Sequence, residues 1–399
     1  MNNSNINELK QSNTNNNQNT KTCFNIFFDN LNKKLSYCTK NTVIVAHSVL
    51  EAIKMKNMEK LYEISENGLP DDLPILRAYV WKIILGYLPI DSTKWGETFL
   101  QKRKEYEVYK NFIKEKLKKE MKNEEYKSKE ILEQIIKDVY RTNIQLSFFF
   151  QPTNRLKTFN NEELINIYKK RKNWNFSKIE DIYQYDNFEN ETHADVLTRI
   201  LFTYSSLFQD VSYHQGMNEL LAPIYYCYSY DKLYIEEEEK DIEADSFWSF
   251  YYLMNGIKSN FDPEQEGLFF KSEILGKCLE IVDNKIFLSL KEKKVNNEYF
   301  CFRWFIMLFS QDFEIGDVLK IWDLIFCRDN KNYFVFYICL GIIILKRDII
   351  LNGCMAEILQ CFQNCNNIIS DDLIFIAREI KNKWKNKIDN IIAKSEKEF

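Results

Sequence analysis

Glycine and proline are scarce in this chain of 399 residues, which contains 10 glycines and 6 prolines. No glycine stands between Gly96 and Gly216, and Pro152 is the only proline in that interval. Few breakers and long periodic stretches predict helices joined by short connections. No two glycines are close enough to build the usual phosphate-cradling loops, so we expect any nucleotide to arrive bound to a partner.

The chain also has little net charge and few groupings of metal-binding residue types. Lysine and arginine number 54 against 58 aspartates and glutamates, a formal net charge of −4, which argues against the basic excess of a nucleic-acid-binding protein. The ten cysteines contain no CxxC pair, and Cys361 and Cys365 have no histidine nearby, so we expect no metal site. Most cysteines lie in apolar runs, and residues 1–20 do not read as a secretory leader. Both features predict a reducing, cytoplasmic location.

Helical periodicity dominates the chain, and alternation of period two is nowhere sustained, which predicts an all-α fold. The longest apolar run, Tyr333 to Leu345, is shorter than the roughly 20 residues that a membrane span needs. Four regions precede or interrupt the main pattern. They are a disordered, Asn-rich arm (1–22), N-terminal helices (23–67) including one helix from about Val43 to Ile64, a charged and solvated helical stretch (102–130), and a polar insertion (150–192).

One segment presents an arginine at the end of an amphipathic helix. Its apolar stripe predicts a buried face, and Gln134, Asp138 and Arg141 fall on the opposite, wet face. Arg141 can pair with Asp138 at i,i+3, and taken alone this would be an ordinary surface ion pair. Thr142 is expected to bond back to the helix backbone. The stripe consists of Ile131, Leu132, Ile135, Ile136 and Val139.

A second segment, residues 213–217, presents a glutamine beside a glycine at a junction between a loop and a helix. A buried amide would need up to four partners, so Gln215 suits an exposed contact surface, and Gly216 permits close approach. Tyr213 is expected to pack and so position the loop, and a general-base role for His214 is not needed. An arginine can neutralise charge on a transferring phosphoryl group, and a glutamine can hold the attacking water.

Several charged residues stand close to tryptophans in the sequence. We expect these residues to form buried or half-buried pairs that fix the contacts between helices. Removing one partner of such a pair should destabilise the fold. These structural candidates are Arg77, Trp81, Arg303, Trp304, Trp322 and Asp323.

Four stretches, in order, resemble the TBC domain of Rab GTPase-activating proteins over roughly residues 60–390. Two of them carry the signatures IxxDxxRT and YxQGM, and the other two resemble the opening helix and later landmarks of the family. His214, in the second signature, stands where the family more often has Cys. The stretches are Gly68-Leu69-Pro70 through Trp81-Lys82 to Pro89, Ile135-x-x-Asp138-x-x-Arg141-Thr142, Tyr213-x-Gln215-Gly216-Met217-Asn218-Glu219-Leu220, and Asp245-x-Phe247-Trp248 with Phe302-Arg303-Trp304 to Trp322-Asp323.

The resemblance implies a V-shaped, two-lobed helical domain with an N-terminal lobe (68–240) that carries both signatures and a C-terminal lobe (241–390). It implies activation of a GTP-loaded Rab in membrane traffic, with Arg141 as arginine finger and Gln215 as glutamine finger. Asp138, Thr142, Tyr213 and Gly216 would support the two fingers. The chain would need no cofactor of its own, because GTP and Mg²⁺ belong to the partner, which could also recruit it to membranes.

Two other functions stay open from the residues. A scaffold could bind a GTPase without accelerating it, although both finger residues are intact. An enzyme acting on a small molecule would have only His47, His193 and His214 and no phosphate loop to work with. A hydrolysis assay with a panel of Rabs separates a GTPase activator from a scaffold. A tightly bound cofactor or metal would favour an enzyme that acts on a small molecule.

Overall fold

The computed structural model describes residues 22–122, 128–142, 147–153, 191–208, 212–230, 239–262, 264–327, 333–365 and 367–398. In these ranges the regular structure is helical, which confirms the predicted all-α fold. No helix in them is long and apolar enough to cross a membrane. The helices are α2 (Thr22–Leu35), α3 (Lys40–Lys54), α4 (Met58–Glu66), α5 (Pro74–Ile84), η1 (Ser92–Lys94), α6 (Trp95–Lys122), α7 (Lys129–Val139), η2 (Ser147–Phe150), α9 (His193–Leu207), α10 (Met217–Tyr230), α11 (Glu239–Ile257), η7 (Lys258–Phe261), α12 (Glu266–Val282), α13 (Asn284–Glu292), α14 (Glu298–Met307), α15 (Ile315–Ile325), α16 (Phe334–Leu345), α17 (Arg347–Asn352), α18 (Met355–Gln363) and α19 (Ser370–Glu398).

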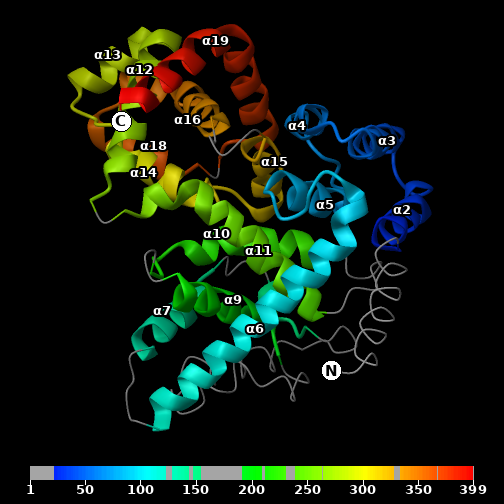
Figure 1. The fold of residues 1–399 in the computed structure, drawn as a ribbon. Helices are drawn as coiled ribbons and strands as arrows, with labels where there is room; N and C mark the ends of the chain where they lie inside the picture. Colours follow the sequence, from blue (N-terminus) through cyan, green and yellow to red (C-terminus); the bar gives the residue numbers. More distant parts are fainter. Residues whose placement is uncertain are drawn as a thin grey trace, which may run out of the picture.

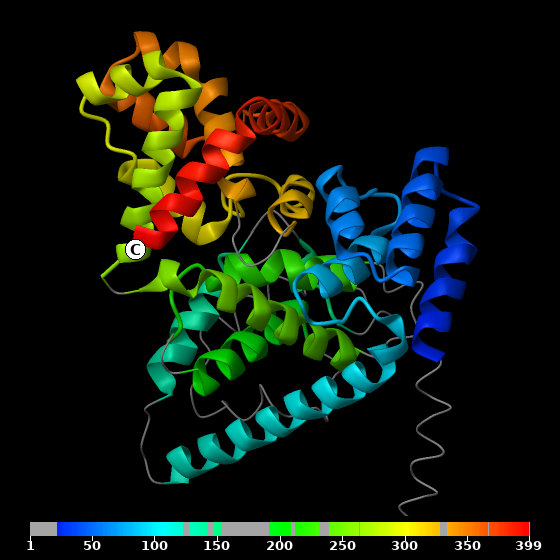
Figure 2. The ribbon, with the colours of Figure 1, turned by 45° about the horizontal axis from the view of Figure 1, so that its top comes forward.

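The helices form two lobes set at an angle to each other (Figures 1 and 2). In the N-terminal lobe α10 packs on α5, α9 and α11, and α6 crosses α11 and α9. In the C-terminal lobe α16 packs against α19, and α12 packs against α13, α14 and α19. Helix α10 also contacts α14 and α15, so the interior helix of the first lobe forms the joint with the second.

The N-terminal helices differ from the prediction of one helix from about Val43 to Ile64. Helix α3 stops at Lys54, and Lys56 adopts a left-handed conformation with φ of +53°. The Asn57 side chain then accepts a hydrogen bond from the Lys60 amide and opens α4 as its N-cap. The apolar spacing continues across this break because both helices bury residues in the same core, so periodicity alone does not reveal it.

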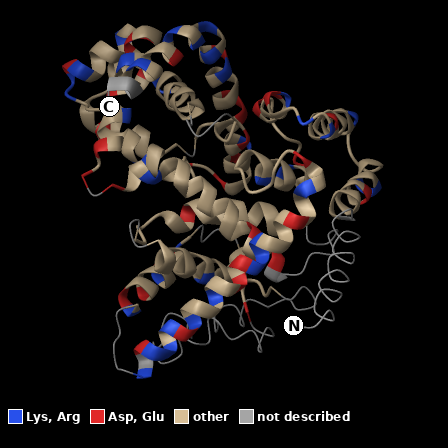
Figure 3. Cartoon of the chain, viewed as in Figure 1, with Lys and Arg blue, Asp and Glu red and all other residues tan. Residues whose placement is uncertain are grey.

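Helix α6 covers most of the stretch predicted as a solvated helix (102–130), but one of its faces belongs to the core. Tyr106, Ile113 and Leu117 are buried on that face. Lys110 is only 1% exposed and contacts the carboxylate of the buried Glu243 on α11 at 3.8 Å. Figure 3 shows basic and acidic residues interspersed along α6. The prediction of a solvated helix therefore does not hold for the face of α6 that packs on the core.

A buried ion pair joins the start of the N-terminal lobe to α15. The Nε atom of Arg77 donates to Asp323 Oδ1 at 3.1 Å, and the indole N–H of Trp81 donates to the same oxygen at 2.8 Å. The Leu69 amide donates to Asp323 Oδ2 at 3.1 Å. Three of the six structural candidates, Arg77, Trp81 and Asp323, therefore bond to one another, although the prediction did not say which of the six would pair.

The remaining structural candidates form separate contacts. Arg303, half-buried on α14, donates to Asp312 Oδ1 at 2.5 Å. Trp322 donates its indole N–H to the Leu308 carbonyl at 2.8 Å. Trp304 is fully buried and packs edge-on against Phe362, with ring centroids 5.6 Å apart.

The ends of the predicted insertion are held together. Pro152 and Thr192 form an isolated antiparallel bridge, and the Thr153 amide donates to the Glu191 carbonyl at 2.8 Å. The two described ends of the insertion therefore lie side by side. The interior of the insertion (154–190) and the N-terminal arm, except Thr22, lie outside the described residues.

Replacing Asp323 with alanine should destabilise the protein by about 3–5 kcal/mol, because the Arg77 charge stays buried and keeps only the exposed Asp71 as an ion-pair partner. The measurement is the free energy of unfolding from urea titration. Glu63→Ala removes an exposed pair with Lys60 and should change that free energy by less than about 0.5 kcal/mol. Similar losses in both variants would contradict a structural role for the buried pair.

Candidate functional site

The site begins where α7 ends. The amides of Arg141 and Thr142 bond to the carbonyls of Asp138 and Val139 at 3.0 and 3.1 Å and continue the last turn. The Arg141 guanidinium donates through Nη2 to Asp138 Oδ1 at 2.9 Å and through Nε to the Lys137 carbonyl at 3.1 Å. Its side chain is nevertheless 60% exposed. The helix end therefore holds a cation at the surface in a defined orientation.

Asp138 is buried, with only 3% of its side chain exposed, so its predicted place on the wet face of the helix is wrong. The loop before α10 covers it: the Tyr213 hydroxyl donates to Asp138 Oδ2 at 3.0 Å. Gln134 donates to the same oxygen at 2.9 Å. Burial, and next the Asp138 charge, raise the pKa of Tyr213 well above its usual value, so its hydroxyl stays a donor.

The glutamine lies in a tight turn at the start of α10. Gly216 has a φ of +108°, a conformation that favours glycine. A Cβ atom added there would lie 1.9 Å from Cε of Met307, the last residue of α14. Gln215 is exposed next to this glycine, as predicted. The backbone of the turn therefore packs closely against the second lobe while the glutamine faces outward.

The arginine and glutamine segments lie side by side, because hydrogen bonds join them directly. One is the bond from the Tyr213 hydroxyl to Asp138. Another runs from the side-chain Nδ2 of Asn218 to Thr142 Oγ1 at 2.6 Å. Thr142 also donates to the Asp138 carbonyl at 3.1 Å, as predicted from sequence. The structure thus brings together the two predicted finger residues and their four predicted supporting residues.

Three residues of the site had no assigned role in the sequence interpretation: Asn218, Glu219 and Met307. Asn218 and Glu219 follow the glycine within the quoted signature, and both are buried polar residues in the first turn of α10. Two polar side chains at the start of an otherwise apolar helix could have indicated a role in the site, because buried polar groups need hydrogen-bond partners. Met307 gave no such indication, since its contact with Gly216 arises only from the packing of α14.

Glu219 is 8% exposed. Burial raises the pKa of this carboxyl to about 7, and the negative charge of Asp138 adds to the shift. Hydrogen bonds from Gln311 and Asn218 act in the opposite direction. The carboxyl therefore changes its protonation state near neutral pH.

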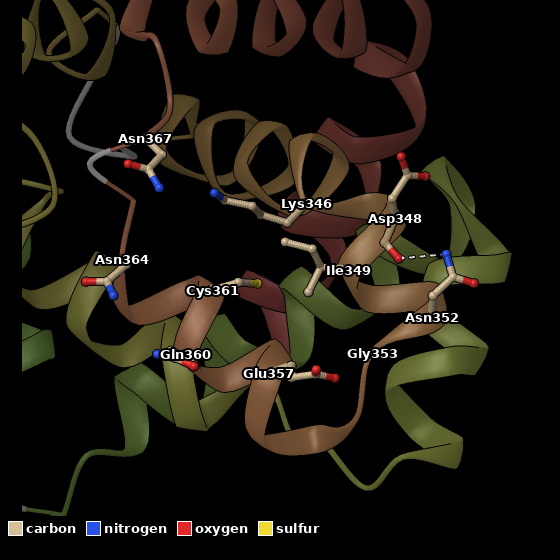
Figure 4. A pocket seen from close by; sticks show the side chains of 10 residues that line it. All are labelled: Lys346, Asp348, Ile349, Asn352, Gly353, Glu357, Gln360, Cys361, Asn364 and Asn367. Carbon is tan, nitrogen blue, oxygen red and sulfur yellow. Dashed lines mark hydrogen bonds between the residues drawn. The ribbon is translucent and has the colours of Figure 1, made fainter.

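A separate depression of about 650 Å³ lies between the end of α16, α17 and α18 (Figure 4). Polar side chains line most of it, among them Lys346, Gln360 and Asn364, with Cys361 between them. None of the predicted site residues contributes to it. Among the described residues there is also no group of three histidine, cysteine or acidic side chains that could hold a metal ion.

Comparison with known proteins shows the family. The family model for the Rab-GTPase-TBC domain matches residues 152–351. The human protein TBC1 domain family member 13 is 31% identical over 356 residues, an alignment that covers 74% of this chain and 87% of the relative. The chain belongs to the Rab-GTPase-TBC domain family. The range matched by the family model contains Gln215 but begins after Arg141.

Other members of the family and their structures agree with this assignment. GTPase-activating protein GYP1 of Saccharomyces cerevisiae is 26% identical over 293 residues, covering 69% of this chain and 38% of the relative. The crystal structure of the Ypt/Rab-GAP domain of Gyp1p superposes with a TM-score of 0.62 at 22% identity, covering 82% of this chain and 93% of that one. A flagellar RabGAP TBC domain from Chlamydomonas gives a TM-score of 0.51 at 16% identity, covering 85% and 92%. These structures support the TBC fold.

The free energy of unfolding should depend on pH through Glu219. Because its pKa is raised by folding, the folded state binds more protons than the unfolded state, and stability falls as pH rises from about 4.5 through about 7. Between pH 5 and pH 8 the wild type should lose roughly 2 kcal/mol more than Glu219→Gln. Urea titrations at both pH values measure this difference, and parallel pH dependences in the two proteins would contradict it.

Proposed function

We propose that this protein is a GTPase-activating protein for a Rab-type GTPase and that it supplies Arg141 and Gln215 to the active site of its partner. The observation that carries the proposal is the direct bonding of the two segments through Asp138 and Tyr213. Membership of the Rab-GTPase-TBC family adds to it, as does the relative that is named a GTPase-activating protein.

Arg141 is suited to act in trans. A guanidinium has five N–H donors, and the bonds to Asp138 and Lys137 engage only one side of it. Its exposure lets the remaining donors reach phosphate oxygens on a docked partner. Charge that develops on the transferring phosphoryl group would then meet a cation that is already oriented, and less ordering is needed when the partner binds.

Gln215 provides the complementary chemistry. Its carboxamide can accept a hydrogen bond from a water and donate one to a phosphate oxygen or a backbone carbonyl of the partner. The left-handed conformation of Gly216 and its contact with Met307 hold the turn, so the side chain projects from a supported backbone. We propose that it orients the attacking water, with GTP and Mg²⁺ brought by the GTPase and with vesicle traffic as the setting.

Arg141→Ala should lower GTP hydrolysis by the partner on the order of 10³-fold or more, because the charge of the finger is lost. Gln215→Ala should lower it on the order of 10²-fold, because the water is no longer held. The measurement is single-turnover hydrolysis by a panel of GTP-loaded Rabs. The wild type should accelerate at least one of them.

Two matched variants serve as controls. Arg347→Ala removes another partly exposed arginine that is paired with an aspartate, and Gln101→Ala removes another exposed glutamine. Both should retain wild-type activity. If the two finger variants also retain it, the proposed mechanism is wrong. GTP-dependent binding without acceleration of any Rab would instead identify the protein as a scaffold.

A further inference from the structure

Asn218 lies beneath both finger segments and contacts each of them. It is the second residue of α10 and only 3% exposed. Its Oδ1 accepts a hydrogen bond from the Gly216 amide at 3.2 Å and lies 3.3 Å from the Tyr213 hydroxyl, whose one proton it shares with Asp138. Its Nδ2 donates to Thr142 Oγ1 at 2.6 Å. One side chain therefore bonds to the turn that carries Gln215 and to the helix end that carries Arg141.

The orientation of the amide follows from its surroundings. The two groups facing Oδ1 are donors, an N–H and an O–H. The groups facing Nδ2 are oxygens, namely Thr142 Oγ1, the Asp138 carbonyl at 3.3 Å and Glu219 Oε1 at 3.3 Å. A flipped amide would place acceptor against acceptor and donor against donor, so only one orientation satisfies the group.

From these contacts we infer that Asn218 is the positioning residue that sets Arg141 and Gln215 relative to each other. The inference rests on the proposed function and extends it. Asp138 orients the arginine, and Gly216 shapes the turn that carries Gln215. Asn218 follows that turn in the first turn of α10, whose neighbouring residues are buried in the core, and its side chain also bonds to the arginine segment. It thus ties both segments to one rigid element.

The chemistry explains why an asparagine is needed at this position. It must donate on one side and accept on the other, which a carboxylate of the same shape cannot do. Asn218→Asp would bring an anionic oxygen against the Asp138 carbonyl and the Glu219 carboxyl. A displacement of about 1 Å at a reacting group can cost about 10²-fold in rate, whereas binding of the partner depends on a much larger surface.

The kinetic test uses the full-length chain and whichever Rab of the panel the wild type activates most. Asn218→Ala and Asn218→Asp should lower kcat by about 10- to 100-fold while KM changes less than about threefold. Tyr228→Phe is the control, because it removes another buried hydrogen bond of α10, to Ser249, away from both fingers. It should stay within about twofold of wild type. A wild-type kcat in the Asn218 variants, or a rise in KM alone, would overturn the inference.

A second measurement does not depend on any GTPase. Hydrogen–deuterium exchange on the isolated protein should show the Gly216 amide and the amides of Arg141 and Thr142 exchanging at least about 10-fold faster in Asn218→Ala, which removes both the acceptor for Gly216 and the donor to Thr142. Amides of α16 and α19 should keep their wild-type rates. Unchanged exchange at Gly216 would overturn the coupling. If the wild type activates no Rab, the proposed function fails, and this measurement alone decides whether Asn218 joins the two segments.

A double-mutant cycle separates coupling from general loss of stability. Thr142→Val removes the oxygen that receives the shortest Asn218 bond. If the two residues act through that bond, Asn218→Ala with Thr142→Val should lower kcat little more than the worse single variant. Multiplicative losses would mean that Asn218 acts elsewhere.

Discussion

A buried carboxylate with three side-chain partners organises the functional side of this molecule. Asp138 is almost fully withdrawn from water, and a buried charge is tolerated only when it is paired and hydrogen-bonded. One of its oxygens receives the Arg141 guanidinium and the other the Tyr213 hydroxyl. Satisfying this one charge therefore draws together two segments that are separated by a long stretch of sequence.

The two lobes both contribute to this arrangement. Helix α10 is buried beneath the site and supports it. Met307 of α14 packs against the Gly216 turn from the other lobe. The ion pair between Arg77 and Asp323 fixes α5 to α15, which itself contacts α10. The relative position of the lobes and the geometry of the site are therefore linked through these contacts.

Much of the fold and part of the site could be predicted from the chain alone. Helical periodicity and the shortage of glycine and proline led to the all-α assignment, and four stretches in order, two of them with signatures, led to the family. The errors have physical causes. The break near Lys56 was missed because apolar spacing continues through it, and α6 was called solvated because its buried Lys110 counts as polar in any sequence pattern.

The sequence by itself determined which chemical groups are present and at what spacing: a guanidinium one helical turn from a carboxylate, and a carboxamide beside a glycine. Local spacing decides such relations because a helix repeats every 3.6 residues. Only the tertiary structure decided that Asp138 is covered, that Asn218 bridges the two segments and that Met307 closes on Gly216. These contacts join residues far apart in the chain, where no periodic rule relates one position to another.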